Sequence, residues 1–226
     1  MNRFIPVIAA GAVAVAAGAY WFTNQPATTL AVTTLPSVSN VQTVASESTD
    51  SSEIVEMVMG AEDAPITIVE YASFTCPHCA NFHEAVLKPL KADYVDTGKV
   101  KFIFRDVYFD RFGLWASMVA RCGGQERFFG MTDYLMETQG EWTRAGDPVA
   151  IADSLRKAGR LAGLEDDQLQ ACLQDEDKAK ALVAWFQENA AADDVQATPT
   201  LLIDGEKHSN MNYEDLRAIL DAKLEG

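Results

Sequence analysis

The stretch FTCPHCANFH, residues Phe74–His83, carries Cys76 and Cys79 with a proline and a histidine between them. It follows a β-branched and aromatic run, Pro65–Phe74, that is apolar on both faces and is typical of a central buried strand. Pro77 suits the first turn of a helix, where its missing N–H costs no hydrogen bond. The sequence therefore predicts a strand, a short turn and a helix that begins at the cysteines.

The cysteine pair fits three kinds of site: a metal site, a structural disulfide or a redox-active pair. A zinc site of four cysteines usually has two C-x-x-C pairs, whereas Cys122 and Cys172 lie far apart in the sequence. A mixed metal site with His78 and His83 is conceivable from the spacing alone. A structural disulfide within one helical turn would close only a small loop and would stabilise the fold little. Redox chemistry is the favoured interpretation, and no metal is expected.

Cys76 lies where the predicted helix begins. A thiol there faces unpaired backbone N–H groups and the positive end of the helix dipole, which stabilise the thiolate. Cys79, one turn further in, is expected to be buried and to act as the resolving cysteine, whereas Cys76 is expected to be exposed. His78 can add positive charge or a hydrogen bond to the thiolate. A stabilised thiolate favours the reduced form, so the disulfide would be a strong oxidant.

The surrounding residues predict an α/β domain interrupted by helices. Residues 53–110 show a short strand, the strand and helix around the cysteines, and a further strand, Lys99–Phe109. Residues 111–194 are almost all helical in pattern, and residues 195–226 carry two short strands and a last amphipathic helix. The order is βαβ, a helical block, then ββα, without an internal repeat.

Several helix boundaries are marked by residues that favour them. Asp147–Pro148 supplies a cap and a first-turn proline to one helix of the inserted block, and Asn212 caps the last helix. The helix after the cysteines is expected to run to about Tyr94, with a kink at Pro89.

The first 52 residues differ in composition from the rest. Within residues 1–23, Arg3 precedes an uncharged apolar run, Phe4–Phe22, which predicts either an export signal or an uncleaved membrane anchor. Residues 24–52 are rich in Thr, Ser, Val and Ala, contain no Lys or Arg, and predict a flexible linker. Both alternatives place the following domain outside the cytoplasm, where disulfides persist.

The charge balance excludes one class of partner. The chain has 18 Lys and Arg residues against 33 Asp and Glu residues, which gives a net charge of −15. A phosphate backbone would be repelled by this excess, so no nucleic-acid partner is expected.

Several motifs together resemble the thioredoxin-fold family of periplasmic thiol oxidases typified by DsbA. The resemblance covers about Ile54–Leu224 and rests on FTCPHC with its helix, FRDVYF, MVARCGGQERFF, ACL and ATPT. It implies an α/β, thioredoxin-like fold, in which a central mixed sheet is flanked by helices and interrupted by an all-helical domain. It also implies a monomer, located in the periplasm as a soluble or membrane-tethered protein, that needs no organic or metal cofactor.

The resemblance also assigns roles to residues. It implies that Cys76 is the nucleophile and Cys79 its resolving partner, and that Pro199 is a cis-proline that faces them and binds substrate together with Thr198. Glu70 matches the family's buried acid beneath the active site, and its alternation with apolar neighbours on the strand favours burial. The implied partners are reduced or unfolded exported proteins and a membrane quinone-linked reoxidant of the DsbB type.

Thr198 departs from the pattern of the best-known oxidase, which has an apolar residue before the cis-proline, whereas several isomerase and reductase relatives carry threonine. A disulfide reductase or isomerase, kept reduced by a membrane electron donor, is therefore an alternative to the oxidase. A redox-inert, chaperone-like binding module is the alternative from another functional class, and the intact cysteines argue against it.

Cys122 and Cys172 remain once the active-site pair is assigned. Free thiols are a liability in an exported chain, so these two residues are expected to form a structural disulfide within the helical block. Two separate buried cysteines are the competing interpretation.

Overall fold

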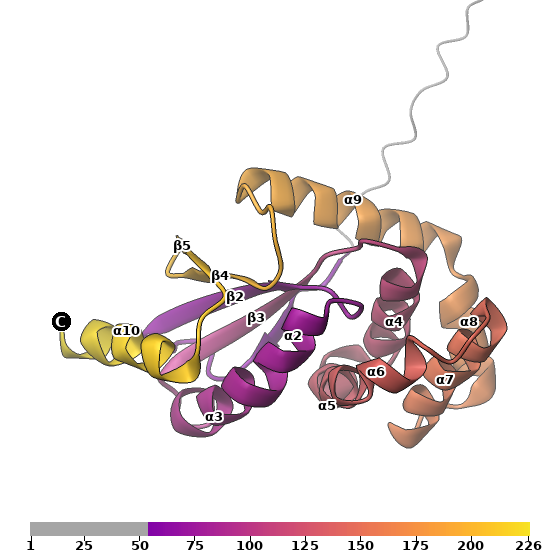
Figure 1. Ribbon diagram of the computed structural model, residues 1–226, viewed down its shortest axis with the longest axis horizontal. Coiled ribbons are helices and arrows are strands. Elements are labelled where there is room, and N and C mark those ends of the chain that lie inside the picture. The colour runs from indigo at the N-terminus through magenta and orange to yellow at the C-terminus, as the bar shows by residue number, and fades with distance from the viewer. Residues whose placement is uncertain (1–53) are drawn as a thin grey trace, which may run out of the picture. The chain divides into compact units, whose positions relative to one another are not determined.

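The computed structural model describes residues 54–226 (Figure 1). The predicted export segment 1–23 and linker 24–52 lie outside this range. Within residues 54–226, no helix combines the length and the apolar character needed to cross a membrane.

Within the described part of the chain, five strands form one mixed sheet in the order β1-β3-β2-β4-β5. The strands are β1 (Met57–Met59), β2 (Ile66–Ala72), β3 (Val100–Asp106), β4 (Thr200–Ile203) and β5 (Glu206–Ser209). β2 and β3 pair in parallel at the centre, and the other neighbours pair antiparallel. The apolar run before the cysteines thus becomes the central strand β2, as the sequence predicts.

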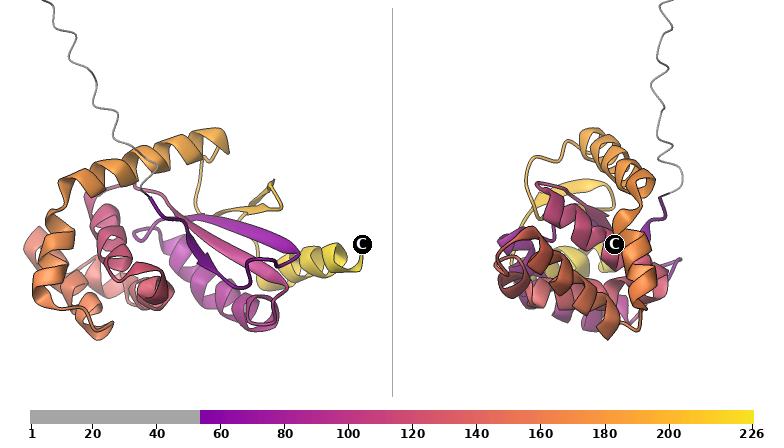
Figure 2. Two further views of the ribbon diagram at one scale, coloured as in Figure 1. Left: turned by 180° about the vertical axis from the view of Figure 1, so that it is seen from behind. Right: turned by 90° about the vertical axis from the view of Figure 1, so that its right-hand side faces the viewer.

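Helices cover both faces of this sheet (Figures 1 and 2). Successive side chains of a strand point to opposite faces. Ile68 and Leu201 pack on the face covered by the helix that follows the cysteines and by α10 (Tyr213–Glu225), which Asn212 caps. Tyr71 and Leu202 pack on the other face, against helix α9 (Glu176–Ala192).

The helix that follows the cysteines is continuous from Pro77 to Val95 but changes its type along its length. Its segments are α2 (Pro77–Phe82), the π-helical η2 (His83–Leu87), α3 (Lys88–Leu90) and the π-helical η3 (Lys91–Val95). Pro89 lies in α3, between the two π-helical stretches. A proline lacks the N–H that a regular helix needs, and wider turns accommodate such a gap. The predicted end near Tyr94 is correct to one residue.

Six helices lie between β3 and β4 and form the insertion predicted from the helical pattern. They are α4 (Arg111–Cys122), α5 (Gly124–Glu137), α6 (Gln139–Trp142), α7 (Pro148–Leu161), α8 (Asp166–Gln174) and α9 (Glu176–Ala192). Asp147 caps α7 by accepting hydrogen bonds from the first backbone N–H groups, and Pro148 occupies the first turn. The long helix α9 carries the chain back over the sheet (Figure 2).

A disulfide joins Cys122, at the end of α4, to Cys172 in α8, with their Cα atoms 5.9 Å apart. The pairing agrees with the sequence expectation. It ties the first helix of the insertion to a helix in its later half.

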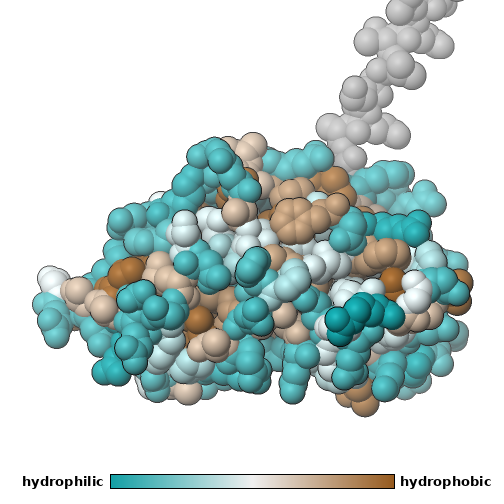
Figure 3. Space-filling view, in the orientation of Figure 1, coloured by the Kyte–Doolittle hydropathy of each residue, from teal (hydrophilic) through white to brown (hydrophobic). Residues whose placement is uncertain are grey.

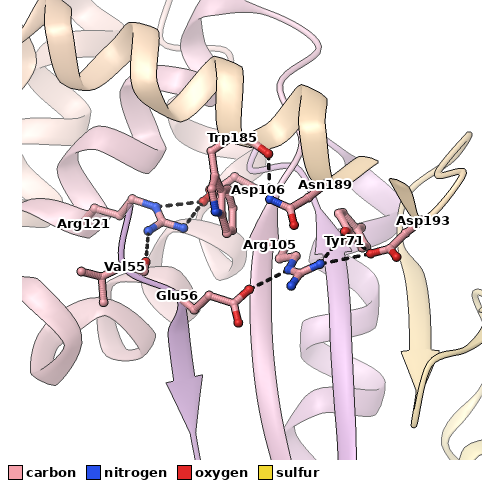
Figure 4. Close-up of polar contacts among 9 residues, drawn as sticks. All are labelled: Val55, Glu56, Tyr71, Arg105, Asp106, Arg121, Trp185, Asn189 and Asp193. Carbon is pink, nitrogen blue, oxygen red and sulfur yellow. Dashed lines mark hydrogen bonds and ion pairs between the residues drawn. The ribbon is translucent and has the colours of Figure 1, made fainter. Parts of the chain in front are cut away.

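Arg105 connects the sheet to α9 (Figure 4). From β3, its guanidinium donates to Glu56 Oε1 at 2.7 Å, to the Tyr71 hydroxyl at 2.8 Å and to Asp193 Oδ2 at 3.1 Å. The guanidinium also lies 5.8 Å from the ring of Trp185 on α9. These contacts bring together the residue before β1, the central strands β2 and β3, and helix α9 with the residue that follows it.

A second arginine, Arg121 of α4, lies on the opposite side of Trp185 (Figure 4). It donates two hydrogen bonds to Asp106 Oδ2, at 2.7 and 3.0 Å, and one to the Val55 carbonyl at 2.9 Å. The Arg121 and Asp106 side chains are only 5% and 1% exposed, so this is a buried ion pair between the insertion and β3.

Candidate active site

The cysteine pair lies where β2 gives way to α2. Cys76 is the residue that precedes the helix, and its backbone is extended. Its N–H donates to the Ser73 carbonyl at 3.0 Å, while its own carbonyl accepts from Cys79 and Ala80 at 3.1 and 3.2 Å. Cys76 therefore stands at the start of the helix, and Cys79 lies one turn inside it, as the sequence predicts.

Both cysteines are free thiols in this structure and both are buried. Cys79 is fully buried, and Cys76 is 7% exposed. The expectation that Cys76 is exposed is therefore wrong, although Cys76 remains the more accessible of the two. The reason is a tertiary contact, because the loop before β4 covers the thiol and brings the Thr198 carbonyl oxygen 3.6 Å from Cys76 Sγ.

The two thiols hold their protons very differently. The pKa of Cys76 is lowered to about 5, chiefly because the Cys79 thiol donates a hydrogen bond to its sulfur; burial opposes this effect without cancelling it. Smaller contributions come from Thr198 and from the backbone N–H groups of Cys79 and His78. The same thiol–thiol hydrogen bond raises the pKa of Cys79, and burial and the charge of Glu70 act in the same direction. One sulfur is thus a thiolate at neutral pH, and the other remains a thiol.

Pro77 and His78, between the cysteines, are both exposed. Pro77 occupies the first position of α2, where it leaves no N–H unpaired. His78 contributes its backbone N–H to the Cys76 sulfur. The expected hydrogen bond from His78 is thus a main-chain bond.

Beneath the thiols, Glu70 of β2 is fully buried and pairs with His83 of η2. His83 Nε2 lies 3.0 Å from Glu70 Oε2, and the ring packs edge-on against Phe104. Among the described residues, Glu70 Oε1 and His83 Nδ1 are buried without a hydrogen-bond partner. Glu70 is thus a buried acid near Cys79, as the resemblance implies.

The role of His83 differs from the one considered in the sequence. Its spacing from the cysteines suggested only a possible metal ligand. Its position four residues after Cys79 places it one turn further along the same side of the helix, which is the signal for a contact beneath the thiols. Across residues 54–226, no group of three or more His, Cys, Asp or Glu side chains is placed to hold a metal ion.

The loop that faces the thiols carries a cis peptide bond between Thr198 and Pro199. Pro199 is buried and Thr198 is half-buried. The Thr198 hydroxyl oxygen is enclosed without a hydrogen-bond partner among the described residues. β4, which follows this loop, pairs with β2, so the sheet itself brings Thr198 and Pro199 to the cysteines.

Two side chains that sequence reasoning did not single out hold the turn before α2. Gln139 of α6 donates from Nε2 to the carbonyls of Phe74 and Cys76, both at 2.9 Å. Thr75 donates from its hydroxyl to Asp110 Oδ2 at 2.8 Å, while the other carboxylate oxygen of Asp110 caps α4. Gln139 occupies an ordinary position in a helical pattern, and no local signal marks it.

A comparison with family models matches residues 52–222 to the model described as thioredoxin. The chain belongs to the thioredoxin family. The match extends across the sheet, the thiol pair and the inserted helices, so this thioredoxin-family domain carries the large insertion within the matched region.

Several known proteins similar to this thioredoxin-family chain have names that refer to disulfide chemistry. A Rickettsia bellii protein named "Putative protein-disulfide oxidoreductase" is 30% identical over 171 residues, which are 75% of this chain and 65% of that protein. Disulfide bond formation protein D of Bacillus subtilis is 27% identical over 178 residues, 75% of this chain and 77% of that protein. The chain spans less than two thirds of the length of the Rickettsia relatives it matches.

Solved structures place the fold among DsbA proteins. The crystal structure of Wolbachia pipientis alpha-DsbA1 is similar with a TM-score of 0.69 and 27% identity, covering 74% of this chain and 89% of that one. A protein-disulfide isomerase from Novosphingobium aromaticivorans is similar with a TM-score of 0.67 and 26% identity, covering 76% and 98%. The thioredoxin-like fold with a helical insertion, expected from the sequence, is confirmed.

Proposed function

We propose that this chain is a protein-disulfide oxidoreductase that donates a Cys76–Cys79 disulfide to reduced proteins. The observation that carries the proposal is that the pKa values of the two thiols are shifted in opposite directions. The pKa of Cys76 is lowered to about 5, whereas the pKa of Cys79 is raised. Whatever stabilises the Cys76 thiolate stabilises the reduced protein, and so makes the disulfide a better electron acceptor. Relatives named for disulfide formation support the same activity.

The reaction uses first the raised pKa of Cys79 and then the lowered pKa of Cys76. A substrate thiolate attacks Cys76 Sγ of the disulfide and breaks the S–S bond, and the bonding electron pair goes to the sulfur of Cys79. Because the pKa of Cys79 is raised, this sulfur takes up a proton and remains a thiol. A second substrate thiolate then attacks the substrate sulfur of the mixed disulfide. Cys76 leaves as a thiolate and needs no proton at neutral pH, since its pKa is about 5. The substrate loses two electrons, and the protein gains them.

Thr198 and Pro199 are proposed to border the bound substrate. The Thr198 carbonyl lies 3.6 Å from Cys76 Sγ, so a substrate sulfur bonded to Cys76 would lie beside this loop. In the space-filling view, the surface between α9 and the start of α2 is less hydrophilic than the rim of this face (Figure 3). Such a surface suits unfolded segments, which expose apolar side chains.

The setting of this chemistry is proposed from the N-terminal sequence. Residues 1–23 would act as an export signal or membrane anchor and residues 24–52 as a linker, ahead of a monomeric periplasmic domain in which residues 111–194 interrupt 53–110 and 195–226. Exported reduced proteins are the proposed substrates. A quinone-linked membrane protein of the DsbB type is the proposed reoxidant, without an added cofactor on this chain.

A reductase or isomerase is the second candidate. It is favoured by the threonine before Pro199 and by the similarity to the Novosphingobium protein, which is named as an isomerase. A redox-inert binding module fits less well, because it would not need one thiol with a lowered pKa beside one with a raised pKa.

The equilibrium of the Cys76–Cys79 pair with reduced and oxidised glutathione tests the proposal. We expect the pair to be mostly reduced at ratios that leave an ordinary structural disulfide intact, and the oxidised protein to form disulfides in a reduced, unfolded substrate. Cys76→Ser is the control and should abolish both results. A pair that stays oxidised against glutathione would favour the reductase, and a pair that exchanges with neither would favour the binding module.

A further inference from the structure

Gln139 occupies an unusual position for a residue of the insertion. It is 7% exposed and lies in the four-residue helix α6, yet its side chain reaches the turn that carries Cys76. Its nitrogen donates to the carbonyls of Phe74 and Cys76, both at 2.9 Å. A side-chain amide has two N–H donors on one nitrogen, and here each has an acceptor.

These two carbonyls stand on either side of Thr75, directly before the helix. Phe74 is buried, so its carbonyl needs a donor from the protein. The Cys76 carbonyl already accepts from the backbone of Cys79 and Ala80, and Gln139 adds a third donor from a different element. The position of Cys76 is therefore fixed from within α2 and from the insertion.

The position of Cys76 decides how its sulfur is solvated. Sγ receives hydrogen bonds from the backbone of His78 and Cys79 and from the Cys79 thiol. Hydrogen bonds weaken steeply as their angles worsen. A small displacement of the turn would therefore weaken all of these hydrogen bonds to Cys76 Sγ together.

We propose that Gln139 is a positioning residue for the thiol pair, whose amide clamps the turn before α2 and holds Cys76 against its hydrogen-bond donors. The proposal rests on the proposed oxidoreductase function and extends it, because it assigns the insertion a part in setting the redox equilibrium. The residue acts through Cys76 and makes no contact with the substrate's sulfur.

The test compares Gln139→Met, which keeps the length but removes both donors, with Trp142→Phe. Trp142 lies in the same helix and donates a buried hydrogen bond to the Leu135 carbonyl at 2.8 Å, so this bond does not involve the cysteine turn. Ultraviolet absorbance of the thiolate against pH gives the midpoint of Cys76. We expect Gln139→Met to raise this midpoint by about half a unit or more, and to make the pair about threefold less oxidising against glutathione, as the loss of aligned donors requires. The Trp142→Phe variant should be less stable, but its Cys76 midpoint and its glutathione equilibrium should be unchanged.

Gln139→Asn provides a milder change in case Gln139→Met does not fold, since it keeps an amide that is one methylene too short. Its midpoint should lie between those of the unaltered protein and Gln139→Met. A contrary result would be that either variant is less stable and yet keeps the Cys76 midpoint and the glutathione equilibrium of the unaltered protein. That result would show that Gln139 has only a structural role and would overturn the proposal. The midpoint is measured without any substrate, so a failure of the proposed oxidase function would leave this test valid.

Discussion

Cys76 and Cys79 are identical side chains three positions apart, and their surroundings give them opposite behaviour. Cys76 precedes the helix and collects hydrogen-bond donors, whereas Cys79 is fully buried and lies near the charge of Glu70. The hydrogen bond between the two sulfurs strengthens the difference, because it favours a proton on one sulfur and its absence from the other. The pair therefore behaves as one unit with a single shared proton.

The lowered pKa of Cys76 makes the stability of the reduced protein depend on pH. The folded value is about 5, whereas an unfolded chain has the ordinary thiol value of about 8.5. Between these values the unfolded state binds more protons, so the free energy of unfolding rises with pH. The thiolate's contribution is complete above about pH 8.5 and is lost as the pH falls towards 5.

We therefore expect the reduced protein to gain stability relative to the oxidised protein as the pH rises from 5 to 8. Urea unfolding of both forms at several pH values measures this difference. The oxidised form is the matched control, because it contains the same residues without a titrating Cys76. A difference that stays constant across this range would show that the Cys76 thiolate is not specially stabilised.

At the scale of elements, the insertion is joined to the sheet by the buried pair of Arg121 and Asp106. Asp106 ends β3 and Arg121 belongs to α4, so the pair bridges the point where the chain leaves the sheet. Removing one member of a buried ion pair leaves an uncompensated charge without water. The pair therefore contributes more to stability than an exposed ion pair such as Lys180–Asp177.

Replacing Arg121 by methionine is expected to destabilise the protein by about 3–5 kcal/mol. The matched control is Lys180→Met on α9, whose partner Asp177 is 94% exposed, and which should cost less than about 1 kcal/mol because exposed ion pairs contribute little. Chemical denaturation of both variants measures the two values. Equal, small losses would mean that water reaches Asp106.

Local patterns in the sequence were sufficient for most elements. The apolar run before the cysteines, the caps at Asp147 and Asn212, and the helical period of the insertion each depend on neighbouring residues, and each agrees with the structure. Strand ends were less accurate: the predicted strand Lys99–Phe109 ends at Asp106, where the chain turns into α4.

Contacts between distant segments were beyond local patterns. Gln139 is 65 residues from Phe74 in sequence, and Thr198 is 122 residues from Cys76. The residues near Gln139 and Thr198 in sequence give no sign of these contacts. The hydrogen bonds from Gln139 to the turn were therefore missed, and Cys76 was wrongly predicted to be exposed. The position of Thr198 beside Cys76 and the cis bond to Pro199 were predicted only because a whole set of motifs resembled a known family.

At the scale of the whole molecule, the Cys122–Cys172 disulfide closes a loop of 50 residues inside the insertion. Replacing both cysteines by alanine should destabilise the protein by about 4 kcal/mol in the chain-entropy model. The equilibrium of Cys76–Cys79 with glutathione should not change, because the cysteine turn is held by Gln139 of α6 and by Asp110 before α4 rather than by this disulfide. Thermal unfolding and the glutathione equilibrium of the double variant measure both effects. An altered equilibrium would mean that the disulfide also shapes the site.

The place of the insertion between β3 and β4 also determines when the site can form. β4 completes the centre of the sheet by pairing with β2, and it brings Thr198 over Cys76 across 122 intervening positions. Contacts of such sequence separation form late and slowly, because the loop between them must first be closed. A chain that is still being synthesised therefore carries both cysteines without the loop that covers them. The cover over Cys76 is completed only when the last strands dock, so the thiol passes from open to enclosed at the end of folding.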